Sequence, residues 1–140
     1  MRLLIMEIPI GNSREEIKDR ERIIFDYYTK WKIENPLQRR YNLSLKDYIN
    51  IRNVSIIETS EHAAKSYLST LAVLQLDAIL TNSTKEKTVN PDPKAKNQNS
   101  FEKMILMKYQ LPGIGNVKLT VGIKRSNKEK VQYCITVIKP

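Results

Sequence analysis

The chain has very little of the residues from which many catalytic and metal sites are built. Its 140 residues include one cysteine, Cys134, and one histidine, His62. A single cysteine cannot form an intrachain disulfide, which favours a reducing compartment. One histidine and one cysteine cannot build the usual zinc sets, and the acidic residues lack the spacing of a calcium loop. We therefore expect neither a metal nor a cofactor.

Long apolar runs are also lacking. The longest helical run, "LAVLQLDAIL", is interrupted by Gln75 and Asp77 and is far too short to span a membrane. The N-terminal "MRLLIMEIPIG" contains Glu7 and Pro9 and has no small-residue cleavage site, so it is a poor signal peptide. We expect a soluble, cytoplasmic protein that forms a single domain over residues 1–140 and has no membrane partner.

Acidic residues are scarce relative to basic ones, and the imbalance is concentrated near the C-terminus. The whole chain has a formal net charge of +9, and residues 118–140 carry six basic residues against Glu129 alone. Any single lysine is equally well explained as solubilising surface charge. The concentration of cations nevertheless favours a polyanionic partner such as nucleic acid.

Residues 2–34 predict an edge strand, or a segment laid across a helix, followed by a helix. The β-rich stretch 2–10 contains a proline, which confines it to a sheet edge or a strand end. Ser13 and Glu16 form a capping-box pattern at the start of a helix over 14–33, which Asn35-Pro36 should end. The apolar stripe of this helix consists of Ile17, Ile24, Tyr28 and Trp31.

The middle of the chain gives weaker signals. Ser44 and Asp47 suggest a short capped helix over 45–51, and 54–57 reads as a brief strand or a packed connection. A longer helix is predicted over 61–82, capped by Thr59 or Ser60. Residues 83–100 have no apolar periodicity and two prolines, so we expect a long flexible loop there.

The C-terminal part alternates between apolar and polar residues with a period of two. This pattern predicts an antiparallel meander of strands at about 102–111, 117–125 and 130–138, with one face in the core. Helices followed by such a meander indicate an α+β fold, in which the N-terminal helices pack on one face of a three-stranded antiparallel sheet. The opposite face is small in its middle and basic at its ends, so another group could approach it closely.

A register for the last hairpin follows from keeping its apolar sets together. It pairs Lys124 with Gln132, which leaves a three-residue loop over 127–129. The same register places Gly122 opposite Cys134 and Thr120 opposite Thr136.

Two basic stretches are the candidate nucleic-acid contacts. "QRRY" at 38–41 combines two guanidinium groups with an aromatic ring, which suits phosphate and base contacts. The final hairpin projects a cluster of cations that suits phosphate contact without base reading. The predicted nucleic-acid-binding residues are Arg39, Arg40, Tyr41, Lys118, Lys124, Arg125, Lys128 and Lys130.

Two single residues have both a structural and a chemical interpretation. Cys134 is read as a small strand residue rather than a nucleophile. His62 is expected near the start of the helix over 61–82, where it is either exposed or hydrogen-bonded, or, together with Lys65 and Ser66, binds phosphate.

The final hairpin, "KLTVGIKRSNKEKVQYCIT", resembles the terminal strands of the barnase–EndoU–colicin–RelE-like modules of phage and mobile-element proteins. The resemblance implies N-terminal helices on an antiparallel sheet and an RNA-facing surface that often cleaves RNA. Under that hypothesis His62, Lys124 and Arg125 would be the catalytic residues. The strands contain no assignable histidine or glutamate, however, and the alternation places Tyr133 on the apolar face.

The leading hypothesis is a small non-catalytic protein that binds RNA or a ribonucleoprotein. Its class suggests a phage or mobile-element inhibitor of a host nucleic-acid-guided nuclease, in the manner of an anti-CRISPR protein. The first alternative is a metal-independent ribonuclease of the barnase or RelE kind, which requires His62 to converge with a cation of the sheet. The second alternative is a protein-interaction module that dimerises through an apolar-rich helix stripe or through the first strand.

Overall fold

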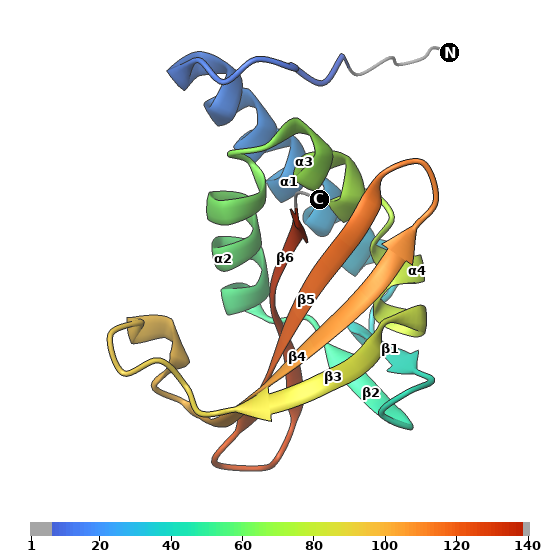
Figure 1. The fold of residues 1–140 in the computed structure, drawn as a ribbon, viewed down its shortest axis with the longest axis vertical. Helices are drawn as coiled ribbons and strands as arrows, with labels where there is room; N and C mark the ends of the chain where they lie inside the picture. Colours follow the sequence, from blue (N-terminus) through green and yellow to red (C-terminus); the bar gives the residue numbers. More distant parts are fainter. Residues whose placement is uncertain (1–6, 139–140) are drawn as a thin grey trace.

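A computed structural model describes residues 7–138, which fold into four α-helices and one six-stranded mixed sheet curled into a half-barrel (Figure 1). The helices are α1 (Arg14–Glu34), α2 (Asn53–Ala63), α3 (Tyr67–Val73) and α4 (Leu76–Asn82). The strands are β1 (Arg39–Asn42), β2 (Asp47–Asn50), β3 (Thr84–Val89), β4 (Phe101–Leu111), β5 (Gly115–Lys124) and β6 (Lys130–Ile138). The predicted strand over 2–10 lies partly outside the described residues, and residues 7–10 have no regular secondary structure.

The first helix follows the prediction closely. The Glu16 backbone N–H donates to Ser13 Oγ at 3.2 Å, and the Ser13 N–H donates back to Glu16 Oε1 at 3.3 Å, so the capping box is formed. The helix ends at Asn35, which is its C-cap. Its buried face contains Ile24, Tyr28 and Trp31, as the apolar stripe predicted.

The stretch between residues 39 and 82 differs from the prediction. Strands β1 and β2 form an antiparallel hairpin where a short helix over 45–51 was expected. The buried Asn42 side chain anchors this hairpin to the end of α4. Its amide donates to the Leu80 carbonyl at 2.8 Å and to the Ser83 carbonyl at 2.9 Å. These partners are distant in sequence, so local propensity could not reveal them.

The predicted helix over 61–82 is divided into three. Helix α2 begins at Asn53, which makes the strand or connection expected at 54–57 wrong, and neither Thr59 nor Ser60 caps a helix. The chain turns after Ala63, and Ser66 caps α3 by accepting from the Ser69 N–H at 3.2 Å. The division lets α2 and α3 follow the outer edge of β6, where the Ser55 hydroxyl donates to the Gln132 carbonyl at 2.5 Å and the Val137 N–H donates to Ser69 Oγ at 2.9 Å.

The sheet has the strand order β1-β2-β6-β5-β4-β3, and every neighbouring pair is antiparallel except the short parallel contact of β2 with β6. The C-terminal meander is present as predicted. The interval 83–100 is not one loop, however, because β3 within it pairs with β4. Five of the six β3 residues are exposed, so this edge strand carries no apolar alternation that sequence analysis could detect.

A β-bulge makes the predicted register of the last hairpin wrong. Thr120 pairs with Cys134 and Gly122 with Val131, and the ladder is interrupted between Thr120 and Val121 so that Tyr133 has no partner across the strand. The extra residue reverses the sides of its neighbours. Gln132, which was expected on the polar face, is fully buried against the helices, while Tyr133 lies in a second apolar cluster with Phe101, Met104 and Val131.

The middle of the polar face, where the side chains are small, is covered by a ring of the chain itself. A Cβ atom added at Gly122 would lie 2.5 Å from the Phe101 ring, so the ring packs directly on the glycine backbone. None of the helices within residues 7–138 is long and apolar enough to cross a membrane.

Candidate nucleic-acid interface and sheet groove

The tip of the β5–β6 hairpin is less available than its sequence suggested. Lys128 forms an ion pair with Glu102, and Lys130 Nζ lies 2.6 Å from Asp47 Oδ2. The hydrogen bond from Lys130 is the main cause that lowers the pKa of the Asp47 carboxyl. Two of the five predicted hairpin cations are therefore neutralised within the molecule.

Glu129, the acidic residue of the same turn, is also engaged. It accepts from Arg52 Nη2 at 2.7 Å and from Arg52 Nε at 3.0 Å, a two-point contact that ties the turn to the start of α2. Such bidentate pairs hold both side chains in one geometry.

Three of the predicted hairpin cations are in a different situation. Across the described residues, Lys118, Lys124 and Arg125 form no ion pair within 4.0 Å. Lys118 is exposed on β5, whereas Lys124 is half-buried and lines a cavity of about 350 Å³ beside Arg52. Arg125 is exposed, and its Nε donates to the Asn99 carbonyl at 3.4 Å. These three cations can be reached by a partner.

The β1–β2 hairpin brings an arginine and two tyrosines together. The Arg39 guanidinium lies 4.0 Å from the centre of the Tyr48 ring, and the Tyr48 and Tyr41 rings meet edge to face with centroids 5.4 Å apart. Tyr41 and Tyr48 keep 42% and 41% of their surface exposed. We call Arg39, Tyr41 and Tyr48 the tyrosine–arginine platform. Sequence analysis missed Tyr48, because a helix over 45–51 would not have paired it with Tyr41.

Arg40, the other arginine of "QRRY", points toward α4 instead. Its Nε donates to Thr81 Oγ1 at 2.8 Å, and its guanidinium lies 3.4 Å from Asp77 Oδ1. Because neighbouring strand residues face opposite sides, Arg40 fastens the hairpin to α4 while Arg39 and Tyr41 face outward.

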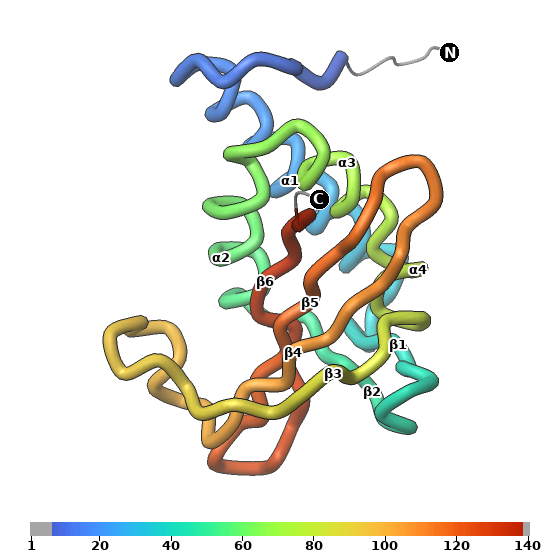
Figure 2. The backbone as a smooth tube through the Cα atoms, in the orientation of Figure 1, coloured from blue at the N-terminus to red at the C-terminus, as the bar shows by residue number. Residues whose placement is uncertain are grey.

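A groove of about 470 Å³ lies between α2, the segment 89–98 and the open face of β4, β5 and β6. In Figures 1 and 2 this segment projects at the lower left, below α2 and away from α3 and α4. We call this cavity the sheet groove. Residues from all three walls line it, including Glu58, His62, Gln98, Lys118, Tyr133 and Cys134.

A buried carboxylate organises one wall of the sheet groove. Glu58 Oε1 lies 3.5 Å from His62 Nε2, and the Asn97 side-chain amide donates to Glu58 Oε2. His62 stands near the C-terminal end of α2, so the prediction that it lies at a helix start, where it could bind phosphate with Lys65 and Ser66, is wrong.

Burial raises the pKa of Tyr133 to about 12 and that of the Cys134 thiol to about 12. The Glu58 carboxylate adds to the increase at Cys134, whereas the Lys118 ammonium opposes it. Both groups are therefore protonated at neutral pH, which agrees with a structural cysteine rather than a thiolate nucleophile.

The groove brings together only part of the predicted ribonuclease set. His62 and Lys118 line the same cavity, and the bulge brings Tyr133 into it as well. Lys124 and Arg125 do not line it. The ribonuclease alternative required a cation of the sheet close to His62. Lys118 shares the groove with His62, whereas Lys124 and Arg125, the two cations named for this role, do not.

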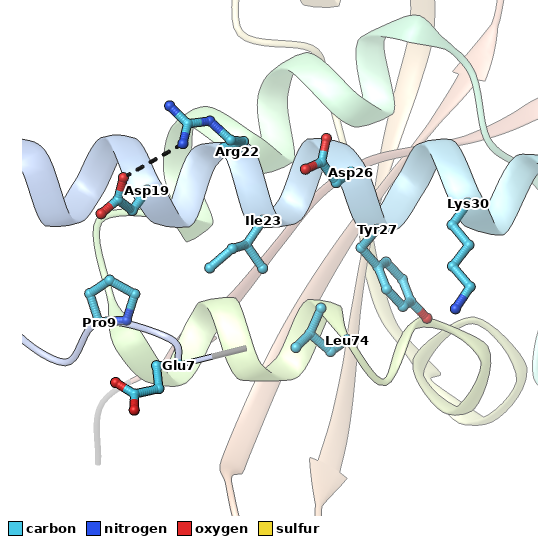
Figure 3. Close-up of a pocket in the computed structure, with 9 residues that line it drawn as sticks. All are labelled: Glu7, Pro9, Asp19, Arg22, Ile23, Asp26, Tyr27, Lys30 and Leu74. Carbon is cyan, nitrogen blue, oxygen red and sulfur yellow. Dashed lines mark ion pairs between the residues drawn. The ribbon is translucent and has the colours of Figure 1, made fainter. Parts of the chain in front are cut away.

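A further cavity, of about 480 Å³, lies between α1 and Leu74 (Figure 3). Its wall mixes carboxylates with the cations Arg22 and Lys30, and Arg22 Nη1 is 4.0 Å from Asp19 Oδ1. The cavity contains none of the predicted site residues, and its mixed charge favours no particular ligand.

Within the described part of the chain, no group of three or more histidine, cysteine, aspartate or glutamate side chains could hold a metal ion. Comparisons with protein-family models, curated proteins and solved structures found no match.

Proposed function

We propose that the protein binds single-stranded RNA without cleaving it, and that the tyrosine–arginine platform is its main base contact. The observation that carries this proposal is the exposed cluster of Arg39, Tyr41 and Tyr48. Aromatic faces and guanidinium planes stack on unpaired bases, and such stacking tolerates many sequences.

The available cations supply the phosphate contacts in this proposal. Lys124 and Arg125 form no ion pair in the described part of the chain, unlike Lys128 and Lys130. The formal net charge of +9 would attract a polyanion from a distance. The RNA is either free in solution or presented by a ribonucleoprotein. The proposed inhibition of a nucleic-acid-guided host nuclease is tested by adding the protein to such a nuclease and measuring target cleavage.

Removing one ring of the platform tests the proposal. We expect Tyr48→Ala to weaken binding of a fluorescent twelve-nucleotide single-stranded RNA about ten-fold, because stacking on one base contributes roughly 1–3 kcal/mol. The matched control is Phe25→Ala, which removes an aromatic ring that is 56% exposed on α1. Fluorescence anisotropy measures both affinities. Equal binding by wild type and Tyr48→Ala would contradict the proposal.

A metal-independent ribonuclease is the second candidate. The observation in its favour is that His62, Glu58 and Lys118 line one groove, where an imidazole could transfer a proton beside a cation. The test is a gel assay of labelled RNA in EDTA with wild type and His62→Gln. We expect both proteins to leave the RNA intact. Cleavage by wild type that His62→Gln abolishes, with folding unchanged by circular dichroism, would establish the enzyme instead.

A further inference from the structure

The sheet groove has two chemically different parts. One wall is apolar and consists of the buried Met104 with the half-buried Val89 and Leu106. Helix α2 contributes His62 to the lining, and β5, the strand next to β4, contributes Lys118. A volume of about 470 Å³ lies within the range of small-molecule sites and can hold a ligand of the size of one nucleotide.

We infer that the sheet groove binds one nucleotide, with the base on the apolar wall and the phosphate between His62 and Lys118. This inference rests on the proposed function, because it assigns the groove to a nucleotide of the bound RNA. The platform and the groove would then be two separate contacts, and each can be tested without the other.

The charged or titratable groups of the lining nearest this site are Glu58, His62, Asp92 and Lys118. Both Glu58 oxygens already have partners, since Oε1 faces His62 and Oε2 accepts from Asn97, so this carboxylate orients the imidazole. Lys118 forms no ion pair among residues 7–138. Asp92, the other acidic residue of the lining, accepts from the Lys94 N–H at 2.9 Å and is exposed at the rim.

The floor of the groove is fixed by the fold. The Phe101 and Tyr133 rings pack edge to face with centroids 6.2 Å apart, and both residues are buried. The Cys134 thiol lies 3.9 Å from the Glu58 carbonyl and joins β6 to α2. A ligand therefore meets a preformed surface, which reduces the ordering cost of binding.

The test uses the full chain and four nucleoside 5′-monophosphates, with the matching nucleosides and inorganic phosphate as separate probes. We expect a monophosphate to bind more tightly than either of its parts in isothermal titration calorimetry. Lys118→Gln should weaken monophosphate binding about ten-fold, the loss expected for a hydrogen bond to a charged group. Lys18→Gln, an equal charge change on the exposed side of α1, should have no effect.

A second variant tests the site by filling the groove, in case the loss of the Lys118 charge alone has little effect on binding. Thr120→Phe places a ring in the groove and should abolish monophosphate binding, with folding verified by its thermal melt. No monophosphate binding by wild type, or unchanged binding by both Lys118→Gln and Thr120→Phe, would overturn the groove site.

The two proposals fail in distinguishable ways. Tyr48→Ala should weaken RNA binding but leave monophosphate binding intact, because Tyr48 does not line the groove. Monophosphate binding without any RNA binding would overturn the proposed function and the assignment of the groove to RNA together. RNA binding that depends on Tyr48 but is unaffected by Lys118→Gln and Thr120→Phe would overturn the groove inference alone.

Discussion

Arg20 is the residue whose role was least visible in the sequence. It falls on the buried stripe of α1 and has no exposed surface. Its Nε donates to the Ala64 carbonyl at 2.7 Å, and its two terminal nitrogens donate to the Pro9 and Gly11 carbonyls at 2.8 and 2.5 Å and to Asn12 Oδ1 at 2.7 Å. The guanidinium thus joins the segment before α1 to the end of α2 through neutral acceptors.

Replacing this guanidinium should destabilise the fold. We expect Arg20→Met to lower the free energy of unfolding by roughly 2–4 kcal/mol, because the change leaves several carbonyl acceptors without their donors. Urea denaturation measures the effect. Arg22→Met is the control, since the Arg22 side chain is 74% exposed and should contribute within about 0.5 kcal/mol. Equal stabilities for the two variants would show that the Arg20 contacts do not hold the structure together.

Among the helices and strands, those that depend on short-range sequence patterns could be predicted from the sequence. The capping box at Ser13 located α1, and the period-two alternation located β4, β5 and β6. Strand β3 escaped detection because it is a polar edge strand. The hairpin containing Tyr41 and Tyr48 escaped because its stabilising partners lie about forty residues further along the chain.

The bulge in β6 was hidden for a related reason. Gln132 is buried because it accepts from the Tyr28 hydroxyl at 2.5 Å and donates to Thr59 Oγ1 at 2.8 Å, and both partners lie on helices. A polar residue in an alternating strand normally indicates a solvent face. Only the three-dimensional arrangement shows that the helices satisfy this amide, and the same bulge moved Tyr133 into the candidate site.

The packing of Phe101 on β5 gives an element-level prediction. Gly122→Ala should lower the free energy of unfolding by roughly 1–3 kcal/mol, because the new methyl group would overlap the Phe101 ring. Combining it with Phe101→Leu should recover part of the loss relative to the sum of the two single changes. Thermal and urea denaturation of the four proteins forms a double-mutant cycle. Strict additivity would mean that the ring and the glycine do not interact.

For the molecule as a whole, the distribution of charge matters more than its sum. The basic residues predicted to contact nucleic acid fall into two groups. Arg40, Lys128 and Lys130 are neutralised by carboxylates of the chain itself, whereas Arg39, Lys118, Lys124 and Arg125 form no ion pair among residues 7–138. Each residue of either group adds one unit to the net charge, but only the second group is ready to pair with phosphate.

This division can be measured through the salt dependence of RNA binding. Replacing Arg39, Lys124 and Arg125 with glutamine should flatten the slope of log affinity against log salt by about two units, at roughly 0.7 per phosphate contact on a single strand. The matched triple variant replaces Arg40, Lys128 and Lys130 with glutamine and lowers the net charge by the same amount. Its slope should change by less than about one unit, because these cations release no counterions on binding.

Fluorescence anisotropy at several salt concentrations gives both slopes, with circular dichroism as the check on folding. Equal flattening by the two variants would mean that RNA responds only to net charge, and the distinction between paired and available cations would then have no part in binding.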